Sequence, residues 1–75
     1  MVFDKIKVIL AEQLYIDENS ITPESLIVED LGADSLDAID IVMSVEDEFG
    51  IEVPDEIVEK METVNDILSY VENNI

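Results

Sequence analysis

Apolar residues recur at helical spacing in three stretches of this chain. Residues 2–15 place Phe3, Ile6 and Leu10 three or four positions apart, and similar patterns run through 35–49 and 64–72. The chain has 75 residues and no cysteine, so no disulfide framework can replace a packed core. We therefore expect one domain over residues 1–75, with an all-α fold.

Capping and breaking residues set the expected helix bounds. Asp34 is suited to cap a helix over 35–49, and Gly50 is suited to end it. Pro54 introduces a short helix over 55–59, and Thr63 caps a last helix that reaches residue 72. The sequence thus predicts a small four-helix bundle, with three longer helices and one short one.

The first connection, between residues 15 and 35, is long and too apolar for a solvated loop. It contains Leu26, Ile27, Val28 and Leu31, so we expect it to pack against the helices. Residues 51–53 alternate like a strand, but a single strand has no partner to pair with, so we expect a loop there.

Charge limits the possible partners. Twenty Asp and Glu residues face three lysines, which gives a formal net charge of −17. Phosphates would repel such a chain, so nucleic acid and anionic membrane surfaces are poor partners, whereas basic protein surfaces would attract it. The alternative is that the charge only keeps a small monomer soluble. No apolar run is long enough to span a membrane, and no signal peptide is evident. We expect a cytoplasmic protein, or an organellar one if a transit peptide has been removed.

Several kinds of catalysis are excluded by residue type. The chain has no histidine and no cysteine, so neither a Ser-His-Asp triad nor a zinc site of those ligands can form. Its two glycines, Gly32 and Gly50, cannot build a glycine-rich phosphate loop. Carboxylate pairs are inevitable at this acid content, so we assign them no catalytic role. We predict a protein that is not an enzyme and has no specific metal site, with weak binding of divalent cations.

The helix over 35–49 carries two apolar stripes. One stripe, suited to the core, consists of Ala38, Ile41, Val42, Val45 and Phe49. The second, called here the outer ridge, consists of Leu36, Ile39 and Met43, and acidic residues border it. An apolar ridge with an acidic border is typical of a docking surface for a partner with a basic rim. The alternative is that the short third helix covers the ridge.

The segment Val28-Glu29-Asp30-Leu31-Gly32-Ala33-Asp34-Ser35-Leu36-Asp37 resembles the prosthetic-group site of acyl carrier proteins. The acidic end of the same helix, residues 46–49, and the segments 54–56 and 63–64 are also similar to this family, so the resemblance covers almost the whole chain. It implies that Ser35 is esterified by 4′-phosphopantetheine, which a phosphopantetheinyl transferase donates from coenzyme A. Without the resemblance, Ser35 would be read as an ordinary residue at a helix start.

The resemblance also implies two sets of site residues and a pathway. Partner enzymes with basic patches would dock on Asp34, Leu36, Asp37, Asp40, Met43, Glu46, Asp47 and Asp55. An acyl chain would lie among Ile27, Val28, Leu31, Ala38, Ile41, Val42, Val45, Val53, Val58, Met61, Ile67 and Tyr70. The expected function is to carry acyl thioesters for fatty acid biosynthesis. The alternatives are another cargo (a polyketide unit, an amino acid or D-alanine) and an unmodified acidic binding module.

Overall fold

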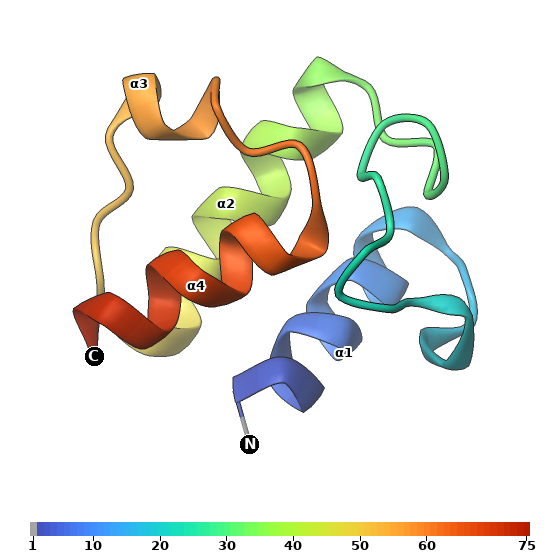
Figure 1. The fold of residues 1–75 in the computed structure, drawn as a ribbon, viewed down its shortest axis with the longest axis horizontal. Coiled ribbons are helices and arrows are strands. Elements are labelled where there is room, and N and C mark those ends of the chain that lie inside the picture. The colour runs from blue at the N-terminus through green and yellow to red at the C-terminus, as the bar shows by residue number, and fades with distance from the viewer. Residues whose placement is uncertain (1) are drawn as a thin grey trace.

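The computed structural model describes residues 2–75 and shows an all-helical fold, as the sequence predicts (Figure 1). Its elements are α1 (Val2–Leu14), a 3-10 turn η1 (Glu18–Ser20), α2 (Ser35–Phe49), α3 (Asp55–Val58) and α4 (Val64–Asn74). The bounds of α2 are those predicted. The first and third helices end one residue earlier than expected, and α4 continues two residues further. None of the described helices is long and apolar enough to cross a membrane.

The core lies where the three longer helices meet. α1 packs against α2 and α4, while α3 packs against α2. In Figure 1, α4 lies in front of α2, and α3 sits at the upper left, above α4. The largest fully buried side chains come from all three long helices and are Ile6, Leu10, Ile41, Val45, Val64, Ile67 and Val71. The apolar face of each long helix therefore packs into one shared core.

The first connection packs on the bundle, as its apolar residues predict. Ile21, Ile27, Leu31 and Ala33 are buried in the same core. Backbone hydrogen bonds fasten the connection to the start of α4: the Ile27 amide donates to the Glu62 carbonyl at 2.9 Å, and other bonds join residues 63–65 to residues 23–26. The connection thus covers one end of the core and brings the chain to Ser35.

Side chains cap both α2 and α4. Asp34 Oδ1 accepts from the Asp37 amide at 2.9 Å, and Asp37 Oδ2 accepts from the Asp34 amide at 3.3 Å. Thr63 and Asp66 form the same reciprocal pair at the start of α4. Hydrogen bonds from the backbone amides of Thr63 and Glu62 hold the pKa of the Asp66 carboxyl below its ordinary value, because they stabilise its charged form. These caps satisfy amides that the first turn of a helix leaves unpaired.

Candidate functional site

Ser35 is the first residue of α2, and its side chain is exposed to solvent. Its hydroxyl makes no hydrogen bond with any of residues 2–75. The capping pair formed by Asp34 and Asp37 fixes the backbone on either side of it. The structure therefore presents an unengaged hydroxyl from a rigid position.

The turn that leads to Ser35 is also well held. Asp30 Oδ2 accepts from the Leu26 amide at 2.8 Å, and the Ala33 amide donates to the Ile27 carbonyl at 3.1 Å. Gly32 has a φ of 77°, a conformation that residues with a side chain rarely adopt. Ala33 is then buried, which anchors the chain two residues before Ser35.

A helix N-terminus is a favourable place for a phosphate group. Its unpaired amides and the aligned peptide dipoles attract an anion. At α2, however, the carboxylates of Asp34 and Asp37 already accept from the amides of the capping pair. A phosphodiester on Ser35 would therefore meet two negative charges, and its position would depend on the covalent ester bond more than on electrostatic attraction.

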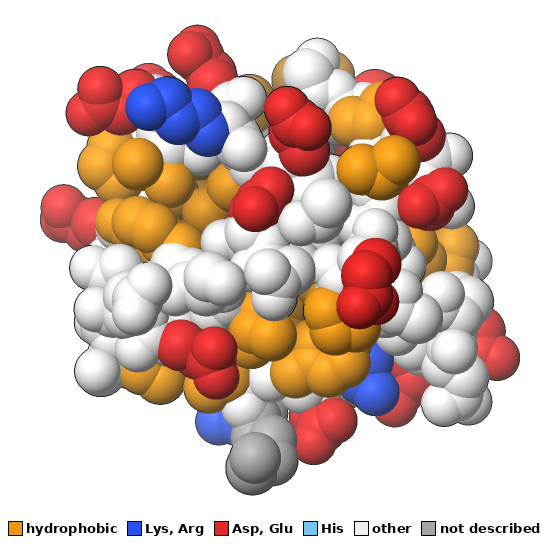
Figure 2. All heavy atoms as spheres, in the orientation of Figure 1, with side chains coloured by type: hydrophobic (Ala, Val, Ile, Leu, Met, Phe, Trp, Pro, Cys, Tyr) orange, Lys and Arg blue, Asp and Glu red, His pale blue; other side chains and the backbone are white. Residues whose placement is uncertain are grey.

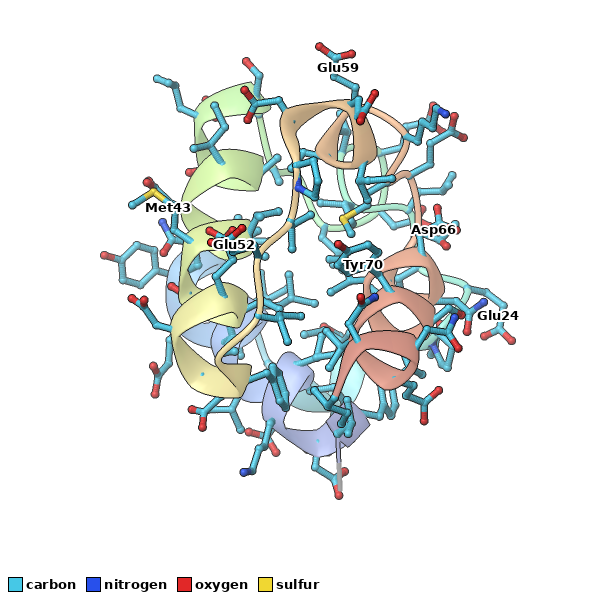
Figure 3. The ribbon with its side chains drawn as sticks, turned by 90° about the vertical axis from the view of Figure 1, so that its left-hand side faces the viewer. Glu24, Met43, Glu52, Glu59, Asp66 and Tyr70 are labelled. Carbon is cyan, nitrogen blue, oxygen red and sulfur yellow. The ribbon has the colours of Figure 1, made fainter. Side chains whose placement is uncertain are left out.

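The outer ridge is exposed in the structure. Leu36, Ile39 and Met43 are 71%, 49% and 56% exposed, so α3 does not cover them. Figure 3 shows Met43 pointing away from the bundle on the outer side of α2. The alternative that the short third helix buries this stripe is excluded.

The carboxylates expected around the ridge fall into two groups. Asp40, Asp47 and Asp55 are exposed, and no lysine among the described residues comes within 4.0 Å of them. Asp34, Asp37 and Glu46 instead accept hydrogen bonds from backbone amides of the chain itself. The first group is free to meet a partner, whereas the second also holds the fold.

Seven of the twelve residues expected to contact an acyl chain surround one small enclosed cavity. They are Ile27, Ala38, Ile41, Val42, Val58, Met61 and Ile67. Every one of these side chains is apolar, and Ala38 lies one turn along α2 from Ser35. The cavity volume is about 20 Å³, room for about one water-sized group. An acyl chain can therefore enter only if the walls move apart.

The other five expected residues do not line this cavity. Val28 is 62% exposed, because the turn over residues 27–32 directs it outward, where it borders a surface groove with Glu29 and Glu59. Leu31, Val45 and Val53 are buried without facing the cavity, and Tyr70 is half-buried. Their placement in a pocket remains a prediction for an expanded state.

The structure also has a larger but more open groove, away from Ser35. A groove between α1 and α2 measures about 480 Å³, but it is open and is lined largely by polar side chains, among them Glu12, Asp47 and Glu48. It is separated from Ser35 by most of the length of α2. An apolar chain attached to Ser35 is better matched by the small cavity than by this groove.

Sequence reasoning missed two contacts near the cavity. Glu46 Oε2 accepts from the Val53 amide at 2.8 Å, and the Tyr70 hydroxyl donates to the Glu52 carbonyl at 2.8 Å. Periodicity carries no signal for either contact, because each joins a helix to a loop whose path depends on tertiary packing.

Comparisons with known proteins identify the family of this chain. Residues 4–71 match the family model described as a phosphopantetheine attachment site. The acyl carrier protein of Helicobacter hepaticus is 49% identical over 72 residues, which cover 96% of this chain and 95% of that protein. The acyl carrier protein of Thermosynechococcus vestitus is 45% identical over 74 residues, covering 99% of this chain and 91% of that protein.

A solved structure supports the same relationship. A chain from Mycobacterium tuberculosis, assigned as an acyl carrier protein, superposes with a TM-score of 0.92 at 29% identity, covering 97% of both chains. Family membership implies a covalently attached 4′-phosphopantetheine group, together with a phosphopantetheinyl transferase and synthesis enzymes as partners. Proteins of this family are carriers rather than enzymes. The sequence, the fold and these matches together show that the chain belongs to the acyl carrier protein family.

Proposed function

We propose that Ser35 bears the 4′-phosphopantetheine arm and that the chain carries acyl intermediates of fatty acid biosynthesis as thioesters. Attachment forms a phosphodiester between Ser35 Oγ and the arm. The phosphoanhydride bond of coenzyme A breaks, 3′,5′-adenosine bisphosphate leaves, and the serine proton passes to solvent. The chain has no cysteine. The thiol that bears the cargo must therefore come from the arm.

The observation that carries the proposal is an exposed hydroxyl one helical turn from an entirely apolar cavity. Ser35 lies in solvent, where a transferase can reach it, while Ala38, Ile41 and Val42 lead from it along the cavity side of α2. Burying a charged or strongly polar cargo against these side chains would cost several kcal/mol. The lining therefore favours a fatty acyl chain over an amino acid or D-alanine.

Exposed acids on α2 and at the start of α3 support docking by partners with basic patches. The ridge supplies an apolar contact, while Asp40, Asp47 and Asp55 supply the surrounding charge. We place this carrier in the cytoplasm or in an organelle that makes fatty acids, and expect it to work as a monomer.

Intact-mass measurement tests the attachment site. After incubation with coenzyme A and a phosphopantetheinyl transferase, we expect the wild type to gain the mass of one phosphopantetheine group and Ser35→Ala to gain none. Ser69→Ala, which changes an exposed serine on α4, is the matched control and should gain the same mass as the wild type. A gain that persists in Ser35→Ala would overturn the site assignment.

The cargo is tested on protein recovered from its own cells. We expect a series of acyl forms whose masses differ by C2H4 units, as stepwise chain elongation produces. A single form bearing one amino acid or D-alanine would overturn the fatty acid assignment and leave the attachment site intact.

A further inference from the structure

Two side chains from different helices hold opposite ends of one peptide group. The carbonyl of the Glu52–Val53 peptide accepts from the Tyr70 hydroxyl of α4, and its amide donates to Glu46 Oε2 of α2, both at 2.8 Å. Figure 3 shows the segment that joins α2 to α3, residues 50–54, running between α2 and α4, with the side chains of Glu52 and Tyr70 next to it. One peptide group is thus bonded to both helices. We call this arrangement the peptide clamp.

The clamp lies immediately before the N-terminus of α3. Pro54 follows it directly and has no amide hydrogen, so the Val53 amide is the last backbone donor before α3 that another element can hold. α3 has only four residues, and no side chain caps its N-terminus. A helix this short has little stability of its own, so its position depends on what anchors its ends.

The same short helix and the turn after it form one wall of the cavity. Val58 and Met61 line the cavity from this segment, and both are only half-buried. The opposite walls belong to α2 and α4, whose Ile41 and Ile67 are fixed in the main core. Because the cavity holds about 20 Å³, a chain that entered it would have to move a wall, and displacing the short α3 segment would break fewer core contacts than separating the long helices.

We propose that Glu46 and Tyr70 are positioning residues, which clamp the Glu52–Val53 peptide and so set how readily the α3 wall opens to the cargo. The inference rests on the proposed function, since it assumes that an acyl chain enters this cavity. The hydrogen bond from Val53 has a charged acceptor and is therefore the stronger of the two. Removal of either bond leaves α2 and α4 in place and releases the segment just before α3 from one of these two helices.

Hydrogen exchange of the protein without cargo tests the clamp itself. We expect the Val58 and Glu59 amides, which donate to the Pro54 and Asp55 carbonyls, to exchange about 3 to 10 times faster in Tyr70→Phe and about 10 times faster or more in Glu46→Ala. The Leu10 amide in α1 should not change. Glu46→Gln keeps an acceptor oxygen at the same place and should restore most of the protection.

Two matched controls separate the clamp from general effects of the substitutions. Glu12→Ala removes an exposed glutamate from α1, and Tyr15→Phe removes the hydroxyl of a tyrosine that is 94% exposed. Neither should change exchange in α3. Equal acceleration in a control and in its matched clamp variant would overturn the proposal, as would unchanged exchange in both Tyr70→Phe and Glu46→Ala.

NMR of the acylated protein then tests the effect on the cargo. With a saturated chain whose terminal methyl is ¹³C-labelled, the wild type should show contacts from that methyl to Val58 and Met61. In the clamp variants, exchange of the methyl between cavity and solvent should be about 3 to 10 times faster. Absence of these contacts in the wild type would overturn the proposed pocket. Their presence with unchanged exchange rates in the variants would overturn only the role of the clamp.

Discussion

Tyr15 has a backbone conformation that glycine adopts at lower cost. Its φ is 57°, in the left-handed region, and the amide of Ile16 donates back to the Ala11 carbonyl at 3.2 Å, which closes the end of α1. α2 ends in a similar way, but with Gly50 at a φ of 65°. The Tyr15 side chain is 94% exposed, so its burial offsets almost none of the strain.

We predict that Tyr15→Gly stabilises the protein by about 0.5–1 kcal/mol. The left-handed conformation costs a residue with a Cβ about 1–2 kcal/mol, and the greater freedom of glycine in the unfolded chain cancels part of the gain. For a domain of this size, the melting temperature followed by circular dichroism should rise by about 2–8 °C. Tyr15→Ala removes the ring but keeps Cβ, so it should give no comparable gain. An equal rise in both variants would assign the effect to the ring.

Many of the acids serve the fold as well as the charge. Within the described residues, six of the twenty side-chain carboxylates accept from backbone amides, and they belong to Asp17, Asp30, Asp34, Asp37, Glu46 and Asp66. The sequence predicts the role of Asp34, because a cap occupies a fixed place before a helix. It does not predict the roles of Asp30 and Glu46, because their partner amides lie in turns that form only when the whole chain is folded.

At the level of elements, α2 has two faces with separate tasks. Its inner face contributes Ile41 and Val45 to the core, while its outer face leaves the ridge uncovered. The exposed acids Asp40 and Asp47 lie on the same helix, and their carboxylates make no hydrogen bond or ion pair with another described residue. They are better probes of docking than Asp37 and Glu46, which also hold backbone amides.

We predict that Asp40→Lys combined with Asp47→Lys raises the KM of the phosphopantetheinyl transferase for this protein by about tenfold at low salt. Reversal of two exposed charges replaces attraction with repulsion during encounter, and salt should reduce the effect. The melting temperature should not fall, because neither side chain supports the fold. Steady-state kinetics with each variant as the substrate would measure the change.

A control with the same change in net charge makes this result specific. Glu24→Lys combined with Glu72→Lys alters two exposed acids outside α2, and Figure 3 shows Glu24 on the side of the molecule opposite Met43. Its KM should change much less. If both pairs raise KM equally, net charge governs the encounter and the α2 surface has no special part in it.

The elements differ in how far the sequence predicts them. The bounds of α2 follow from its capping residues Asp34 and Gly50, and its two faces follow from periodicity, because a helix fixes its own side-chain directions. The cavity is only partly predictable. Periodicity places Ala38, Ile41 and Val42 on one face of α2, and all three line the cavity, whereas Val28 points outward with the turn that carries it. Loop direction depends on hydrogen bonds to distant residues, such as that from Ile27 to Glu62, which no local pattern contains.

At the scale of the whole molecule, the dominant fact is a formal net charge of −17 on a particle of about 26 × 25 × 19 Å. Figure 2 shows acidic side chains scattered over the visible face, between patches of apolar side chains. Lys5 pairs with Glu48 at 3.9 Å, and Lys7 pairs with Asp4 at 3.7 Å, so most acids have no basic partner within residues 2–75. Repulsion among them opposes the compact state.

We therefore predict that Mg²⁺ and Ca²⁺ raise the melting temperature more than NaCl does at equal ionic strength. Monovalent salt only screens the repulsion, whereas a divalent ion can also associate with neighbouring carboxylates and neutralise them. No cluster of three or more metal-ligating residues forms within residues 2–75, so the rise should be gradual with concentration rather than saturate at one tight site. Calorimetry across a concentration series would measure it. Equal effects of NaCl and the divalent salts would show that screening alone accounts for the stabilisation, whereas saturation at one equivalent would reveal a specific site.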